Sequence, residues 1–212
     1  MTYILYGEKG SGAFCVEAAL REAGAPFEFH EISLEKDEQR ADDFRALNPS
    51  GKIPALKLPS GEIVTETAAL LYLIAERHPE AKLLPESGSP ERSQALRWIA
   101  FMAAEIYPMV EIGDYPERFV ADHKAAATLK QNAGRRIHER MMMVEAAASG
   151  TPWFLASGFS AVDLYAVMFS RWRDCRVGGW REEHLPKICA MATALSQRDT
   201  IREIYPAYFP KG

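Results

Sequence analysis

"NPSGKIPAL", residues 48–56, is the stretch that decides the fold. Pro54 stands before the strand-like "ALKL", and a proline fits poorly inside a central strand because it donates no backbone hydrogen bond. A cis Ile53–Pro54 bond would turn the chain sharply and leave the Ile53 N–H and C=O groups pointing outward, ready to receive an extended peptide as another strand. A trans proline in an ordinary loop is the alternative. The local residues alone favour it, because only about 5–6% of X–Pro bonds in folded proteins are cis.

Short strands and helices alternate around this stretch. "PALKL" and "EIVT" flank the turn "PSG" at residues 59–61, which predicts a hairpin. "TYILYG" and "PFEFHEI" predict two earlier strands, and the second alternates apolar and polar side chains. The predicted helices are residues 11–23 with a stop at Gly24, residues 37–47, and residues 66–78 ended by Pro79. The predicted order is therefore β-α-β-α-β-β-α, an α/β domain over residues 1–78.

The chain changes character after this domain. Residues 79–90 contain prolines and small polar residues, a composition typical of a linker. Residues 91–212 contain long helical patterns and no convincing pair of strands. We therefore expect an all-helical second domain over residues 91–212.

A second candidate ligand-binding feature is "VTETAALLYLI", residues 64–74. Glu66 and Thr67 fall at the first turn of a predicted helix, where free N–H groups and the helix dipole favour a ligand carboxylate. Glu66 can take a ligand ammonium group and Thr67 can add a hydroxyl donor, which together suit the α-amino-acid end of a small peptide. Helix capping is the alternative explanation, because acids and threonines are common at helix starts.

The composition argues against several function classes. A formal net charge of −4 gives no electrostatic case for nucleic acid or an anionic membrane as a partner. No apolar run approaches the ~18 residues of a membrane span, and the first residues do not read as a signal peptide. The three cysteines and five histidines show no disulfide framework and no metal-ligand spacing. We therefore expect a cytoplasmic protein with no metal ion.

Taken together, these segments resemble the cytosolic glutathione transferases over the whole chain. "GFSAVDL", residues 158–164, extends the resemblance, since a similar segment forms an N-capping box in that family, with Ser160 and Asp163 as its two members here. The resemblance implies a thioredoxin-like N-terminal domain, an all-helical C-terminal domain and a homodimer. It implies glutathione as co-substrate, with no other cofactor, and a small hydrophobic electrophile as second substrate.

The resemblance also assigns roles to the residues of the first domain. The Ile53 backbone would pair with the cysteinyl part of glutathione, next to a cis Pro54. Glu66 and Thr67 would hold the γ-glutamyl end.

Four further residues receive looser assignments. Lys36 and Lys52 lie near positions that reach the glycyl carboxylate in some classes of the family. Tyr107 and Tyr115 belong to an aromatic-rich part of the helical half, and they are candidates to line the pocket for the electrophile, which faces that half in this family.

The loop "EKGSG", residues 8–12, would then handle the thiol. A glutathione thiol resembles free cysteine, with a pKa near ~8.5, so a donor at a helix start is needed to stabilise the thiolate. Ser11 has a hydroxyl group and lies at the start of the predicted helix. The rivals are Tyr6 in the first strand, Cys15 one turn into the helix, and the backbone N–H of Gly12.

Several classes of function remain open at this point. Some family classes use a tyrosine and the bacterial beta class uses a cysteine in this region, so the class is undecided, although some beta-class resemblance exists. A glutathione S-transferase is the favoured function. A glutathione-dependent peroxidase or disulfide reductase, and a non-catalytic interaction module, are the alternatives.

Overall fold

The computed structural model describes residues 2–210, without the side chain of residue 173. Residues up to Leu84 and those from Leu195 onward form one compact unit, and residues 85–194 form a second. The C-terminal segment therefore groups with the N-terminal unit, whereas the sequence analysis assigned it to the helical domain. The expected boundaries, 1–78, 79–90 and 91–212, remain a prediction about which parts fold as domains.

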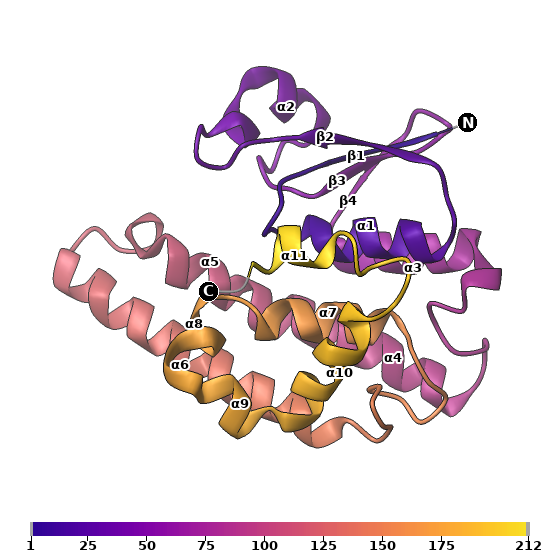
Figure 1. The fold of residues 1–212 in the computed structure, drawn as a ribbon. Coiled ribbons are helices and arrows are strands. Elements are labelled where there is room, and N and C mark those ends of the chain that lie inside the picture. The colour runs from indigo at the N-terminus through magenta and orange to yellow at the C-terminus, as the bar shows by residue number, and fades with distance from the viewer. Residues whose placement is uncertain (1, 211–212) are drawn as a thin grey trace. The chain divides into compact units, whose positions relative to one another are not determined.

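The N-terminal unit contains one four-stranded sheet (Figure 1). The strands are β1 (Tyr3–Gly7), β2 (Phe27–Glu31), β3 (Ala55–Lys57) and β4 (Ile63–Thr65). Their order is β2-β1-β3-β4, with β1 parallel to β2 and β3 antiparallel to both β1 and β4. The predicted strands and the predicted hairpin are confirmed.

Helices cover both faces of this sheet. Figure 1 shows α2 on one face, with α1 and α3 on the other. The helices of this unit are α1 (Ala13–Glu22), α2 (Asp42–Leu47), α3 (Thr67–Arg77) and the short α11 (Tyr205–Tyr208), with 3-10 turns at Glu38–Arg40 and Pro79–Ala81. This is the thioredoxin-like arrangement that was expected.

Two helix predictions need adjustment. The predicted helix over 37–47 is divided, because Ala41 has an extended backbone between the 3-10 turn and α2. α1 begins at Ala13 and not at Ser11, because Gly12 is its N-cap residue. Its end is as predicted. Gly24 has a φ of 58°, and the Ala25 N–H reaches back to the Leu20 carbonyl at 3.0 Å, which satisfies the end of the helix.

Contacts along the whole of α1 explain why the C-terminal segment belongs to this unit. The Phe14 ring is fully buried and meets the rings of Tyr208 and Phe209 at centroid distances of 5.3 and 4.7 Å. At the other end of α1, the Arg198 guanidinium binds both oxygens of the Glu22 carboxylate, at 2.8 and 2.5 Å. A bidentate pair of this kind fixes both position and orientation.

The second unit is built from helices, as predicted. They are α4 (Pro90–Phe101), α5 (Tyr107–Asp114), α6 (His123–Ala147), α7 (Ala161–Ser170), α8 (Arg173–Arg176), α9 (Trp180–His184) and α10 (Pro186–Ser196), with short turns at Met102–Ile106, Pro116–Arg118 and Val177–Gly179. Within the part of the chain that is described, the extended pairing in this unit amounts to an isolated bridge between Leu155 and Gly158.

The turn between α4 and α5 is π-helical. Pro108 follows it and has no N–H to give to the carbonyl four residues before it. A wider turn at Met102–Ile106 accommodates the lost hydrogen bond, which is a usual cause of such irregularity in a long helix.

A capping box starts α7, as the sequence predicted. The Asp163 carboxylate accepts the Ser160 N–H at 2.7 Å through one oxygen and the Phe154 N–H at 2.7 Å through the other. Asp163 is fully buried, as is every other residue of α7. Burial raises the pKa of Asp163 to about 6, although the hydrogen bonds from Phe154 and Ser160 oppose the rise.

We predict that Asp163→Asn lowers the free energy of unfolding at neutral pH by about 1–3 kcal/mol. An amide offers one acceptor oxygen where the carboxylate offers two, so one buried N–H loses its partner. Chemical denaturation measures the difference. Asp199→Asn is the control, because that carboxylate is 88% exposed. Equal losses in the two variants would contradict the role of the box.

The difference in stability between the wild-type protein and Asp163→Asn should depend on pH. Since the pKa of Asp163 is raised in the folded state, the folded protein holds this proton more tightly than the unfolded chain does. The stabilising contribution is therefore complete below the unfolded pKa, near ~4, and is lost as the pH rises through about 6. The stability deficit of Asp163→Asn should accordingly be larger at about pH 4 than at about pH 7.

Candidate functional site

Three segments of the N-terminal unit meet at one end of the sheet. Tyr6 pairs with Ala55 in β3, and Ala55 pairs with Thr65 in β4. Because β3 is antiparallel to both neighbours, β1 and β4 end where β3 begins. The loop of residues 8–12, the Ile53–Pro54 bond and the start of α3 therefore leave the sheet at the same end. The pairing brings together the predicted peptide-binding and thiol-binding residues.

The Ile53–Pro54 peptide bond is cis, as predicted. Among residues 2–210, no hydrogen bond of the protein involves the Ile53 N–H or C=O. The turn before it is fixed, because the Asn48 side-chain amide donates to the Lys52 carbonyl at 2.6 Å. The backbone of Ile53 is thus available to an extended ligand.

The start of α3 has an unusual backbone. Glu66 has a φ of 68° and a ψ of 110°, a positive φ that a residue with a side chain rarely adopts. Such strain costs about 1–3 kcal/mol and concentrates at functional sites. The exposed Glu66 side chain makes no capping hydrogen bond to its own helix, so capping does not explain this acid. Thr67, the first residue of α3, is buried.

Ser11 lies in the loop before α1 and is engaged in local hydrogen bonds. Its hydroxyl donates to the Glu8 carbonyl at 2.6 Å and accepts the Ala13 N–H at 3.2 Å. The Glu8 carboxylate in turn accepts the Leu34 N–H at 3.0 Å. The Ser11 oxygen is therefore at the N-terminus of α1, but the hydroxyl must leave the Glu8 carbonyl before it can donate to a sulfur.

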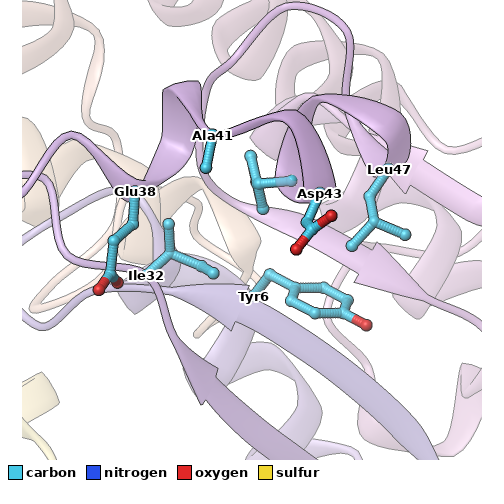
Figure 2. Close-up of a pocket in the computed structure, with 7 residues that line it drawn as sticks. Tyr6, Ile32, Glu38, Ala41, Asp43 and Leu47 are labelled. Atoms are coloured by element: carbon cyan, nitrogen blue, oxygen red, sulfur yellow. The ribbon is translucent and has the colours of Figure 1, made fainter.

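Tyr6, the first rival of Ser11, lies on the other face of the sheet. Its ring contacts Phe44 of α2 at a centroid distance of 6.3 Å. Figure 2 shows it beside a pocket of about 270 Å³ below α2, with Ile32, Ala41 and Leu47 among the lining residues. This geometry directs Tyr6 away from α1.

Cys15 and Gly12 are also placed by the structure. Cys15 is fully buried, and burial raises the pKa of its thiol well above the usual value. It behaves as a small buried apolar residue. Gly12 has an ordinary helical φ of −59°, so its conformation does not require glycine. Gly10 does, because its φ is 89°.

The remaining predicted residues are spread over both units. Lys36 and Lys52 are exposed in the N-terminal unit. In the helical unit, Tyr107 packs edge-on against Phe169 at a centroid distance of 5.3 Å. Tyr115 is 36% exposed, with the Arg118 guanidinium over its ring. Both tyrosines belong to the helical unit.

Two contacts of Lys9 in this loop, with Glu17 and with Tyr208, were not predicted from the sequence. Lys9 pairs with Glu17, which is buried within α1, and Glu17 also accepts the Tyr208 hydroxyl at 2.7 Å. The signal was present in "AFCVEAAL", where a single acid interrupts an apolar helix. A buried carboxylate needs partners, and they came from distant parts of the chain.

The described residues form neither a metal-binding cluster nor a membrane-spanning helix. Residues 2–210 contain no group of three or more His, Cys, Asp or Glu side chains that could hold a metal ion. Within the same range, no helix combines the length and the apolar character needed to cross a bilayer.

The chain is similar in sequence to several known proteins along most of its length. Residues 13–77 match the family of glutathione S-transferase N-terminal domains. The chain is 28% identical over 201 residues to an uncharacterized GST-like protein of Escherichia coli strain K12, covering 94% of this chain and 95% of the relative. It is 23% identical to a maleylacetoacetate isomerase of Pseudomonas aeruginosa, covering 95% of this chain and 94% of the relative.

Solved structures agree on the fold. A beta-class glutathione S-transferase of Sphingomonas chungbukensis is 28% identical, with a TM-score of 0.80 over 97% of this chain and 98% of that one. A glutathione transferase homologue of Sulfitobacter with bound glutathione is 23% identical, with a TM-score of 0.89 over 98% of this chain and 99% of that one.

The sheet, its cis proline and the helical second unit define a thioredoxin-fold protein with a helical extension. Residues 13–77 match a glutathione S-transferase N-terminal domain, and the chain resembles proteins of the glutathione S-transferase family along nearly its whole length.

Close packing of α1 on β1 yields a prediction about Gly7. A Cβ at Gly7 would fall well inside the contact distance of the Ala13 Cβ. Gly7→Ala should therefore push α1 away from the sheet end and lower the free energy of unfolding by about 1–3 kcal/mol, a typical cost of overpacking. Adding Ala13→Gly removes the clash. Calorimetry should show that the double variant is more stable than Gly7→Ala, and the opposite order would contradict this account.

Proposed function

We propose that this protein is a glutathione S-transferase that binds glutathione at the end of the sheet and activates its thiol as a thiolate. The observation that carries the proposal is the cis Ile53–Pro54 bond, with an Ile53 backbone that bonds nothing else among residues 2–210, beside the start of α3. The cysteinyl part of glutathione pairs with Ile53 as an added strand. Glu66 takes the ammonium and Thr67, with the N–H groups of α3, takes the carboxylate of the γ-glutamyl end.

The orientation follows from the register. With its γ-glutamyl end at α3 and its cysteinyl part at Ile53, glutathione directs its sulfur toward the loop of residues 8–12. There Ser11 and the N-terminus of α1 stabilise the thiolate through a hydrogen bond and the helix dipole. Lys36 and Lys52 are proposed to attract the glycyl carboxylate. Ser11 is not a base, because its hydroxyl bonds only backbone groups.

The thiolate then attacks a small hydrophobic electrophile: the sulfur forms a bond to carbon while the leaving group departs with its electron pair. Tyr107 and Tyr115 are proposed to line the electrophile pocket, because both present aromatic surface in the helical unit. The protein is proposed to act as a homodimer in the cytoplasm, with glutathione as co-substrate and no further cofactor.

An isomerase reaction is the second candidate function. A relative aligned over nearly the whole chain is named as a maleylacetoacetate isomerase. Such a reaction uses the same thiolate, which adds to a double bond and is later expelled, so glutathione is regenerated. Peroxidase or disulfide-reductase activity through a protein thiol has less support, because Cys15 is fully buried.

The experiment that tests the proposal combines binding with turnover. The protein is passed over immobilised glutathione, then assayed with a panel of electrophiles, peroxides and cis-dienoic acids. Retention and conjugation support the transferase, and double-bond isomerisation without consumption of glutathione supports the isomerase. Retention on glutathione without any turnover would indicate a non-catalytic interaction module that binds glutathione.

We predict that Thr67→Ala weakens glutathione binding while the fold is kept. Loss of one hydrogen bond to a charged group should cost about 1.5–3 kcal/mol of binding free energy, measured by titration calorimetry. Thr128→Ala is the matched control, since that hydroxyl bonds only the carbonyl one turn earlier in α6. Unchanged affinity in Thr67→Ala would show that the residue serves only the start of the helix.

We also predict that Ser11→Ala raises the pKa of the bound glutathione thiol. The hydroxyl chiefly stabilises the anion, so the rate at neutral pH should fall more than the affinity for glutathione. The thiolate absorbance and the pH–rate profile should both move to higher pH.

A control is needed because Ser11 also ties its own loop. Ser89→Ala removes a comparable serine cap, whose oxygen accepts the Arg92 N–H at 3.1 Å at the start of α4. That variant should leave the thiol pKa unchanged. The serine assignment is wrong if Ser11→Ala keeps the wild-type pH–rate profile while Tyr6→Phe or Cys15→Ala abolishes activity. If none of these three variants loses activity, the Gly12 N–H and the N-terminus of α1 remain as the candidates that stabilise the thiolate.

A further inference from the structure

Three distant parts of the N-terminal unit contact the side chain of Lys9, which is 35% exposed. Its ammonium group pairs with the Glu17 carboxylate of α1. It also lies over the Phe29 ring of β2, 4.0 Å from the centroid, and over the Tyr208 ring of α11, 4.6 Å from the centroid. A cation in contact with two ring faces and a carboxylate is held from several directions, although part of its side chain is exposed.

The carboxylate that binds Lys9 is buried and shared. Glu17 is 2% exposed, and the same oxygen that meets Lys9 accepts the Tyr208 hydroxyl at 2.7 Å. Its other oxygen accepts the Arg21 Nε–H at 3.2 Å. Burial raises the pKa of the Tyr208 phenol, so this group remains a donor. A buried carboxylate with these partners is a fixed anchor, since Lys9 and Arg21 compensate its charge and the Tyr208 hydroxyl adds a hydrogen bond.

The anchor connects the C-terminal segment with the loop proposed to bind sulfur. Lys9 is the second residue of the loop of residues 8–12, two positions before Ser11. Gly10, between them, has a φ of 89°, a backbone conformation that favours glycine. α11 is fastened separately to α1 through Phe14.

We propose that Lys9 is a positioning residue: its clamp by Glu17, Phe29 and Tyr208 fixes the loop of residues 8–12, so that the C-terminal segment sets the alignment of the donors that stabilise the glutathione thiolate. The inference rests on the proposed function for the identity of the sulfur ligand. The fixation of the loop by Lys9 does not rest on the proposed function.

The test compares four variants of the full chain. Lys9→Met keeps the apolar stem and removes the charge. Lys9→Met combined with Glu17→Gln also removes the carboxylate charge, which guards against a loss of folding from an unpaired acid. Tyr208→Phe keeps the ring and removes the hydroxyl. Arg21→Met is the matched control, because Arg21 binds the same carboxylate from within α1 and does not touch the loop.

Two quantities are measured for each variant after thermal unfolding confirms the fold. Hydrogen exchange followed by mass spectrometry reports opening of residues 8–12 without any ligand. The pH dependence of thiolate absorbance and of the glutathione dissociation constant reports the bound thiol. We expect loop exchange to rise about tenfold, equivalent to about 1.4 kcal/mol, in both Lys9 variants and in the same direction in Tyr208→Phe. The thiol pKa should rise in these variants, while glutathione affinity changes less.

Other outcomes overturn the proposal. Unchanged loop exchange in both Lys9 variants would show that the clamp holds nothing. An equal rise in Arg21→Met would attribute the effect to the buried acid and not to Lys9. A looser loop with an unshifted thiol pKa would separate the clamp from the sulfur donors. If the unaltered protein binds no glutathione, the proposed function fails by itself, and the exchange measurement still decides whether Lys9 positions the loop.

Discussion

The candidate site depends on one constraint, the pairing of β3 with a strand on each side. β3 is only three residues long, yet it is antiparallel to both β1 and β4. Its first residue, Ala55, therefore lies beside Tyr6, one residue before the end of β1, and beside Thr65, the last residue of β4. Apart from Lys36, the groups proposed to bind glutathione in the N-terminal unit lie on one of the three connections at that end. The close contact of Gly7 with Ala13 then brings the N-terminus of α1 to the same place.

Local sequence patterns were sufficient for most of this framework. The strands, the hairpin, the end of α1 at Gly24 and the capping box with Ser160 and Asp163 each depend on residues close together in the chain. The cis bond before Pro54 was different. Local residues favoured trans, and only the combination with neighbouring segments, read as a family resemblance, indicated cis.

The features that escaped prediction depend on partners far apart in sequence. Glu17 looked like an isolated acid in an apolar helix, and nothing near it in the chain identified Tyr208 as its partner. For the same reason the sequence did not indicate that the C-terminal segment groups with the N-terminal unit. The Ser11 hydroxyl points toward the Glu8 carbonyl because of the detailed geometry of the turn, and residue types do not specify that geometry.

The burial of the cysteines has a consequence for experiments with sulfur reagents. Burial raises the pKa of all three thiols, to about 12 for Cys175 and to a lesser degree for Cys189, whose side chain is partly accessible. At neutral pH the protein therefore contributes almost no thiolate of its own. An ultraviolet thiolate signal, or rapid alkylation by a haloacetamide, would report the bound tripeptide with little background from the polypeptide.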